Sequence, residues 1–256
     1  MKMVGSFIIA LSMYSTLPMP RIAWDKRYMR YTMAFFPVIG FAIGGVDWCW
    51  WWLSSYLHLN QTLFAAGLTL IPVFITGGIH LDGFCDTMDA LSSHAEQERK
   101  LEILKDSHTG AFAVIGLAAY FLLYFGLASQ LQVNNAAIAV LTLGFVLSRA
   151  LSGFAVASFR CAKNSGLVYT FADTAAKKQV RMVLAAFILL CIFGIFAIHF
   201  EYGIAVLIIC CFTFWYYRRM AYRQFGGITG DLAGYFLQLC ELGILAGVVA
   251  IQCVNR

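Results

Sequence analysis

The sequence has few charged residues. Only 12% of its 256 residues are Asp, Glu, Lys or Arg, whereas 61% are hydrophobic. Soluble domains carry about 25% charged and roughly 45–50% apolar residues, so this composition excludes an ordinary soluble domain. The mean hydropathy of +0.76 indicates the same. We therefore expect an integral membrane protein that contacts the lipid bilayer over much of its surface.

Recognisable cysteine motifs are also missing. The eight Cys form no C-x-x-C pair and no Cys/His zinc spacing, which favours reduced, buried thiols over a disulfide framework or a zinc site. No small-residue cleavage site follows the first apolar run, so we expect no cleavable signal. The net charge of +5 would suit nucleic acid, but in a membrane protein basic residues usually set topology. We expect no nucleic-acid partner.

Long apolar runs recur seven times along the chain. The bilayer interior admits only helices or closed barrels, and a helical span needs about 20 residues. We therefore predict an all-α, polytopic membrane helix bundle of about seven transmembrane helices, forming one domain over residues 1–256. A shorter run at 3–17 predicts an interfacial or re-entrant helix, or a marginal span. The seven long runs occupy residues 33–57, 61–79, 109–128, 135–157, 182–199, 203–217 and 232–253.

Basic residues concentrate in four connecting segments, which hold 15 of the 18 Lys and Arg. By the positive-inside rule these segments face the cytoplasm. The unusual polar residues lie in or near the same segments. A transporter is expected to hold such groups near mid-membrane, so their position favours an enzyme that works at the cytoplasmic surface. The segments are residues 18–32, 80–108, 158–181 and 218–231.

Three aspartates crowd into eight positions of a chain that has only 13 acidic residues. On a helix Asp82, Asp86 and Asp89 fall at about 0°, 40° and 340°, on one face. Grouped carboxylates are ligands for Mg²⁺, which usually shares its shell with substrate phosphates. An acidic helix start would explain Asp82 or Asp86, but not a stripe that continues to Asp89. The spacing favours a Mg²⁺–diphosphate site.

Two further residues near this stripe are candidates for chemistry. His80 precedes the first aspartate by two positions and suits a general base or a partner of the metal shell, although a backbone hydrogen bond would also account for it. Asp106 leads a turn of small residues into the next apolar run. It is either a helix N-cap or a further carboxylate for the site, supplied by a second helix.

Cationic candidates for phosphate oxygens are Arg149, Arg160 and Lys163. Topology alone would account for Arg160 and Lys163. Arg149 is more informative because an unpaired Arg in hydrocarbon is costly, so it must face the bundle or reach the cytoplasmic end. By depth in the membrane, it could pair with Glu241 in the last apolar run.

A glycine-rich turn, residues 226–234 (GGITGDLAG), precedes the last apolar run. Such a turn opening a helix presents backbone N–H groups to a phosphate, which makes Gly227 and Gly230 candidate substrate-binding residues. Asp231 at the helix start is either a cap or another metal ligand.

Taken together, these stretches resemble the cobalamin synthase family, adenosylcobinamide-GDP ribazoletransferase. The resemblance runs the length of the chain and is specific because several motifs occur together. One departure is Thr16, where an Arg would be expected before the Leu-Pro-x-Pro element. The matching stretches are residues 17–20 (LPMP), 36–40 (FPVIG), 77–83 (GGIHLDG) with Asp86, Thr87 and Asp89, 106–107 (DS) with 110–112 (GAF), and 227–231 (GITGD).

The resemblance implies the nucleotide-loop assembly step of cobalamin (vitamin B12) biosynthesis. Family members join adenosylcobinamide-GDP to α-ribazole or its 5′-phosphate, release GMP, need Mg²⁺ and lie in the bacterial inner membrane. We accordingly expect Asp82, Asp86, Asp89 and Asp231 to hold Mg²⁺, with Asp106 closing the site. Arg149, Arg160, Lys163, Gly227 and Gly230 would bind substrate, and His80 or an Asp would accept the hydroxyl proton. A homo-oligomer is compatible with this expectation.

Two other functions fit parts of the pattern. The CDP-alcohol phosphotransferases are also polytopic and carry spaced aspartates, but they place an Ala-Arg pair soon after Asp-Gly, whereas residues 84–86 here are Phe, Cys and Asp. A cation-coupled transporter could use the aspartate cluster as its ion site.

Overall fold

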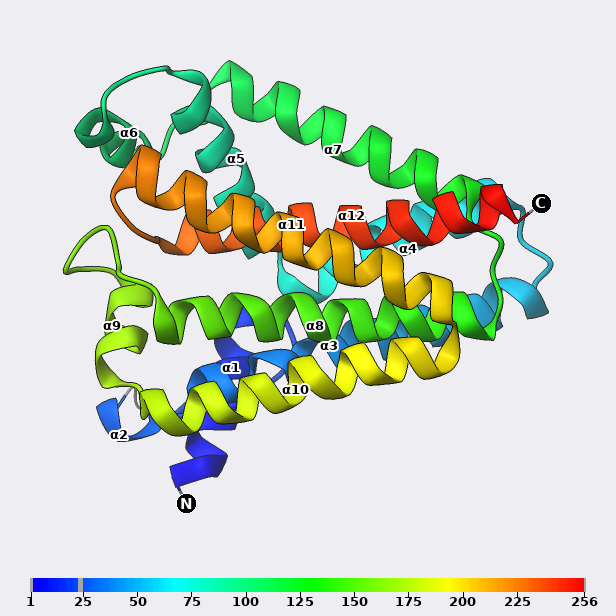
Figure 1. The fold of residues 1–256 in the computed structure, drawn as a ribbon, viewed down its shortest axis with the longest axis horizontal. Helices are drawn as coiled ribbons and strands as arrows, with labels where there is room; N and C mark the ends of the chain where they lie inside the picture. Colours follow the sequence, from blue (N-terminus) through cyan, green and yellow to red (C-terminus); the bar gives the residue numbers. More distant parts are fainter. Residues whose placement is uncertain (1, 23–24, 256) are drawn as a thin grey trace.

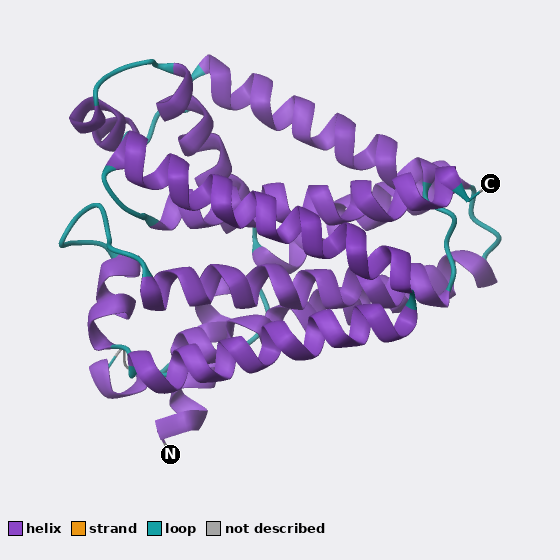
Figure 2. Ribbon diagram, viewed as in Figure 1, coloured by secondary structure: helices purple, strands orange, loops and turns teal. Residues whose placement is uncertain are grey.

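The computed structural model describes residues 2–22 and 25–255 of the chain, so Met1, Ala23, Trp24 and Arg256 of the predicted domain lie outside the described residues. Over the described part the fold is helical throughout and has no named strand (Figures 1 and 2). The helices are α1 (Lys2–Tyr14), α2 (Lys26–Met29), α3 (Thr32–Tyr56), α4 (Gln61–Thr76), α5 (Ile79–Ser92), α6 (Gln97–Ile103), α7 (Ala111–Gln130), α8 (Asn135–Ser158), α9 (Leu167–Thr174), α10 (Lys177–Ile198), α11 (Phe200–Phe225) and α12 (Gly230–Val254).

The predicted all-α membrane bundle is confirmed. Within the described ranges, six helices are long and apolar enough to cross a bilayer, namely α3, α7, α8, α10, α11 and α12. The bent pair α4 and α5 brings the number of spans to seven if it counts as one crossing. The protein is therefore a multi-pass membrane protein, as its composition indicated.

The prediction of one continuous span over residues 61–79 was wrong. Helix α4 has only 16 residues and ends at Gly77, and α5 leaves it at an angle of 95°. Gly77 and Gly78 both adopt left-handed backbone conformations, with φ of 63° and 76°. Glycine adopts this conformation without a steric penalty, and it terminates helices. The apolar pattern hid the break because the residues on both sides of it are also hydrophobic.

The connecting segments rich in basic residues gather at one end of the bundle. Figure 1 places α2, α6, α9 and the turn between α11 and α12 at the left end. The short run predicted at 203–217 is part of a longer helix, because α11 continues through Arg218, Arg219 and Arg223 to Phe225. Arginines are good helix formers, so the helix persists after the apolar pattern has ended.

The short run near the N-terminus forms α1, whose 13 residues are too few to span a bilayer. Thr16, two residues after the end of α1, forms hydrogen bonds with the C-terminal end of α4. Its hydroxyl donates to the carbonyl of Phe74 at 2.8 Å, and its backbone N–H donates to the carbonyl of Ile75 at 2.8 Å. The last carbonyl groups of a helix lack hydrogen-bond donors within the helix, and Thr16 supplies two such donors here. Thr16, which stands where an Arg was expected, therefore has a structural role.

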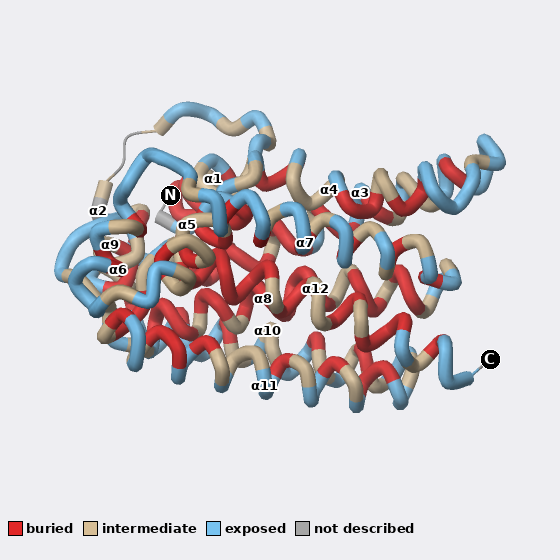
Figure 3. Tube along the Cα trace, turned by 90° about the horizontal axis from the view of Figure 1, so that it is seen from above, coloured by how far each residue is buried: buried red, intermediate tan, exposed pale blue. Residues whose placement is uncertain are grey.

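Burial separates a central helix from peripheral ones. Of the most apolar 18 residues of α8, 72% are buried, against 17% for α10. Figure 3 shows the buried residues along the middle of the bundle, around α8 and α12. Large apolar side chains such as Leu189 and Phe193 of α10 remain exposed. In a membrane protein, such an apolar outer face contacts lipid tails.

Candidate active site

Helices α5 and α12 cross with their backbones nearly touching. A Cβ atom added at Gly83 would lie 2.7 Å from the Cα of Asp231, and one added at Gly234 would lie 2.9 Å from the carbonyl oxygen of His80. Small residues allow membrane helices to approach closely. The crossing therefore sets the first turns of α5 and α12 side by side, with the acidic residues of both.

The crossing gathers carboxylates from two helices. Asp82, Asp86 and Asp89 all lie on α5, as their spacing predicted, and Asp231 lies in the first turn of α12. Helix α5 places the half-buried Asp86 carboxylate within electrostatic reach of Asp82, Asp231 and Asp89. The Thr229 hydroxyl caps α12 by accepting a hydrogen bond from the N–H of Leu232, and it lies 3.3 Å from the carboxylate of Asp231. Like charges this close favour a cation or a proton between them.

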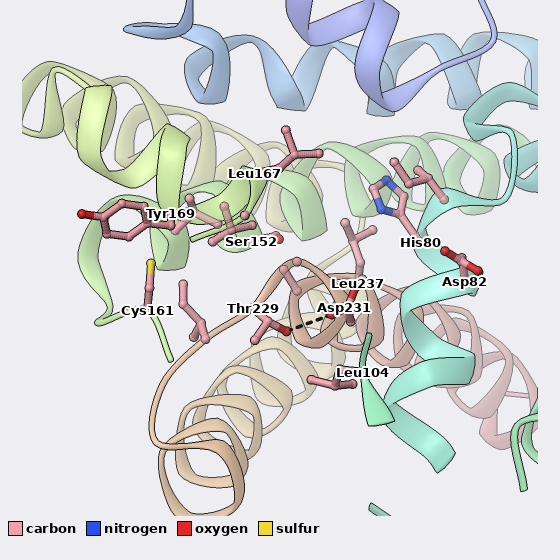
Figure 4. A pocket seen from close by; sticks show the side chains of 18 of the residues that line it. His80, Asp82, Leu104, Ser152, Cys161, Leu167, Tyr169, Thr229, Asp231 and Leu237 are labelled. Carbon is pink, nitrogen blue, oxygen red and sulfur yellow. Dashed lines mark hydrogen bonds between the residues drawn. The ribbon is translucent and has the colours of Figure 1, made fainter. Parts of the chain in front are cut away.

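A cavity of about 390 Å³ opens beside this crossing, at the end of the bundle that holds the basic segments. Its walls come from α1, α3, α5, α6, α8, α9 and α12, from the loop between α8 and α9, and from the segments that follow α6 and precede α12. In Figure 4, His80 and Asp82 lie at one end of the cavity, Tyr169 and Cys161 at the other, and Thr229 and Asp231 between them. The predicted site residues that line it are His80, Asp82, Lys163, Gly230 and Asp231.

The cationic groups of the cavity are Lys105 and Lys163, which the fold brings together from two loops. The Lys163 ammonium donates to the carbonyl of Leu101 at 2.9 Å, which holds the loop between α8 and α9 against α6. Burial, and then the neighbouring positive charge of Lys105, lower the pKa of Lys163. A cavity lined by two ammonium groups and two carboxylates suits an anionic substrate that brings its own metal ion.

Arg149 lies elsewhere, in the dry core. Its guanidinium donates to Glu241 at 2.6 Å and to the carbonyl of Phe145 at 3.0 Å, and its exposed fraction is 0%. The pairing with Glu241 expected from membrane depth is confirmed, and Ser148 also bonds that carboxylate. Since Arg149 does not line the cavity, its predicted contact with substrate gains no support from the structure.

Arg160 and Gly227 shape the cavity without lining it. Arg160 donates through its side chain to the carbonyl of Gly226 and through its backbone to the hydroxyl of Tyr222, both at 2.9 Å. A Cβ at Gly227 would lie 2.6 Å from the carbonyl oxygen of Arg160. A short parallel bridge pairs Cys161 with Ile228 at the same place. These contacts fix the loop that carries Lys163 against the start of α12.

Two of the predicted acids are engaged in local structure. The carboxylate of Asp89 accepts the N–H groups of Gly110 at 2.6 Å and Ala113 at 2.8 Å, so both of its oxygens hold the start of α7. Asp106 lies in the exposed loop before α7 and bonds His108, whose backbone and side-chain hydrogen bonds lower the pKa of Asp106. Neither residue lines the cavity. Their predicted roles as metal ligand and closing carboxylate remain predictions.

His80 lines the cavity but is itself nearly enclosed, with an exposed fraction of 5%. Its ring stacks on Tyr14 at 6.0 Å and meets Phe36 edge-on at 5.6 Å between centroids. Its Nε2 atom has no hydrogen-bond partner in the described structure. Sequence reasoning missed Tyr14, Lys105 and Thr229 as cavity residues. Of these three, only Thr229 could have been found from the sequence, because a Thr directly before the first residue of a helix is a typical N-cap.

The carboxylates of the site can be compared with the ligands that Mg²⁺ takes. Among the described residues, no group of three or more His, Cys, Asp or Glu is arranged to hold a metal ion unaided. The donor set nevertheless fits, because Mg²⁺ is usually bound by one or two carboxylates while water and substrate phosphates complete its shell. Asp82 and Asp231 line the cavity, and Asp86 lies within electrostatic reach of both.

A family model described as cobalamin-5-phosphate synthase matches residues 6–249. The chain belongs to the cobalamin-5-phosphate synthase family. The match to this family covers the seven predicted runs but for the last few residues of α12, together with all the cavity-lining residues.

Curated relatives in the family are similar over nearly their whole length. An adenosylcobinamide-GDP ribazoletransferase of Lachnoclostridium phytofermentans is 45% identical over 98% of this chain and 95% of its own. Proteins of the same name from Clostridium perfringens and Desulfitobacterium hafniense are each 34% identical over 93% of this chain and 94% of their own. No solved structure gives a significant match. The family resemblance inferred from the motifs is confirmed.

Proposed function

We propose that this protein transfers the adenosylcobinamide phosphate group from adenosylcobinamide-GDP to α-ribazole or α-ribazole 5′-phosphate, with release of GMP. This is the nucleotide-loop assembly step of cobalamin biosynthesis, and the names of the relatives support it. The observation that carries the proposal is one cavity lined both by the carboxylates Asp82 and Asp231 and by the ammonium groups Lys105 and Lys163. The family match does not favour a CDP-alcohol phosphotransferase or a transporter.

The reaction is a displacement at phosphorus. A hydroxyl oxygen of the acceptor bonds to the phosphorus attached to cobinamide, the bond from that phosphorus to the bridging oxygen breaks, and GMP leaves with that oxygen. Lys105 and Lys163 offset negative charge on the diphosphate, and the N-terminus of α12 at Gly230 adds backbone N–H groups. The hydroxyl proton passes to His80 or to an aspartate of the cluster.

Magnesium is part of the proposal. Bound by Asp82, Asp86 and Asp231 together with the substrate, Mg²⁺ would neutralise the diphosphate charge. Asp89 is left out of this set because its two oxygens already accept hydrogen bonds at the start of α7. We also propose that the protein lies in the bacterial inner membrane with the cavity facing the cytoplasm. The basic segments lie at the same end of the bundle as the cavity.

The direct test is GMP release by the purified protein on addition of adenosylcobinamide-GDP, α-ribazole and Mg²⁺. Asp82→Asn and Asp231→Asn should each lower kcat by about a hundredfold or more, because each removes a carboxylate that would hold Mg²⁺ beside the reacting phosphate. Asp173→Asn is the matched control, since Asp173 is exposed on α9 and does not line the cavity. Near-normal kcat for Asp82→Asn at low Mg²⁺ would overturn the metal assignment.

A further inference from the structure

The end of the cavity that holds His80 and Asp82 has an aromatic side (Figure 4). There the ring of Tyr14 packs on Phe36 at 4.6 Å and on His80 at 6.0 Å between centroids. The side chains of Met13, Met33 and Leu237 also line the cavity. A diphosphate needs the carboxylates and ammonium groups described above, so the aromatic side is available for another part of a substrate.

His80 supplies an unpaired polar atom on the aromatic side. Its ring is enclosed, and Nε2 is buried and has no partner among the described residues, although His80 lines the cavity. A buried nitrogen without a hydrogen bond is costly, so a ligand that enters the cavity and bonds Nε2 would remove that cost. The rings of Tyr14 and Phe36 lie beside the His80 ring. This arrangement favours a ligand with a flat aromatic group that has a polar atom on its edge to bond Nε2.

The aromatic wall is held rigidly, although Tyr14 belongs to a short N-terminal helix. Thr16, two residues on, bonds the carbonyls of Phe74 and Ile75 next to the break between α4 and α5. On the preceding turns, Phe7 packs edge-on against Phe35 of α3 at 5.7 Å. Tyr14 is therefore positioned from both sides, which is the arrangement expected of a binding wall rather than of a fraying end.

We propose that Tyr14, Phe36 and His80 form the subsite for the aromatic base of the acceptor nucleoside, and that Tyr14 determines its affinity. This inference rests on the proposed function, because it places α-ribazole within the same cavity. His80 and Asp82 lie at the same end of the cavity (Figure 4), so a base at His80 leaves the sugar hydroxyls near the carboxylates. An aspartate, and not His80, then accepts the hydroxyl proton. The guanine of the donor fits less well, since its many polar edge atoms would meet mostly apolar side chains.

Steady-state kinetics of a Tyr14 series test the subsite. With saturating adenosylcobinamide-GDP, Tyr14→Leu should raise the KM for α-ribazole by about threefold to tenfold, the size expected for a lost aromatic contact. Tyr14→Phe keeps the ring and should restore the KM. Phe171→Leu is the matched control, because Phe171 packs on Tyr14 at 6.4 Å but does not line the cavity. An unchanged KM for α-ribazole in Tyr14→Leu overturns the proposal, as does a rise only in the KM for adenosylcobinamide-GDP.

Two measurements keep the test independent of folding and of turnover. In the wild-type protein, benzimidazole should inhibit competitively against α-ribazole and not against adenosylcobinamide-GDP, and the reverse pattern overturns the subsite. Equilibrium dialysis of radiolabelled α-ribazole without donor should show weaker binding to Tyr14→Leu than to the wild type, and equal binding overturns the subsite. Failure of the proposed function has a different signature, which is α-ribazole binding by the wild type with no GMP release when donor is added.

Discussion

At the scale of single residues, three aspartates on one face of α5 have different surroundings. Asp82 faces the cavity, whereas both oxygens of Asp89 accept backbone N–H groups at the start of α7. Gly110 is required there, because a Cβ would lie 2.6 Å from an oxygen of Asp89. The stripe of carboxylates therefore divides between a residue that lines the cavity and a residue that anchors a helix.

This division predicts opposite results for two isosteric changes. Asp89→Asn should lower the free energy of unfolding by about 1–2 kcal/mol, because an amide cannot accept both N–H groups. It should leave the Mg²⁺ concentration for half-maximal GMP release unchanged. Asp82→Asn should change that concentration or abolish activity with little loss of stability. Thermal unfolding in detergent measures the stability of each variant, and a Mg²⁺ titration of GMP release measures its Mg²⁺ requirement. A raised Mg²⁺ requirement in Asp89→Asn would indicate that Asp89 is a metal ligand after all.

At the scale of elements, the site depends on the approach of α5 to α12. The break at Gly77 and Gly78 turns α5 across the bundle, and Gly83 and Gly234 allow it to lie against the start of α12. Without the turn, Asp82 would continue along the axis of α4 and would not meet Asp231.

Adding a single methyl group at the crossing tests this. Gly83→Ala should lower kcat by at least about tenfold and destabilise the fold by roughly 1–3 kcal/mol, because the new Cβ meets the backbone of Asp231, which cannot rotate away. Gly126→Ala in α7 is the control, since a Cβ there has no neighbour within 4 Å. It should be neutral or slightly stabilising. Steady-state kinetics and thermal unfolding of both variants measure these effects. Wild-type activity in Gly83→Ala would show that the close approach of α5 to α12 is not needed for activity.

At the scale of the whole molecule, a buried ion pair links its most central helices. Arg149 of α8 and Glu241 of α12 are both buried and lie 2.6 Å apart. Glu241→Gln should lower the free energy of unfolding by about 3–5 kcal/mol, because it leaves the Arg149 charge unpaired. The double change Arg149→Met with Glu241→Met should recover most of that loss. Equal stability of Glu241→Gln and wild type in detergent unfolding would rule out the pairing.

The orientation of the bundle is also testable. Membrane-impermeant maleimide should label His58→Cys, in the loop between α3 and α4, from outside intact cells. Asn164→Cys, in the loop between α8 and α9, should react only after permeabilisation. Both positions are exposed. The native exposed residues Cys49, Cys211 and Cys253 would first be changed to Ser. The reverse labelling pattern would place the cavity on the outer side.

The sequence by itself determined the membrane class, the helical fold, the end of the bundle that carries the polar segments and most of the acids at the site. These features follow from hydropathy, run length, charge and the helical period. Each of these is a local property of a segment and does not depend on the segments packed against it. The pairing of Arg149 with Glu241 also followed, because an unpaired charge in hydrocarbon leaves few alternatives.

Only the tertiary structure decided the 95° break after α4, the separate role of Asp89 and the entry of Lys105 and Tyr14 into the cavity. Each depends on how closely two backbones approach, and that distance is set by residues far apart in the chain. The aspartate stripe thus specifies a charged helical face, while the close approach of Gly83 to Asp231 sets which of its carboxylates lines the cavity.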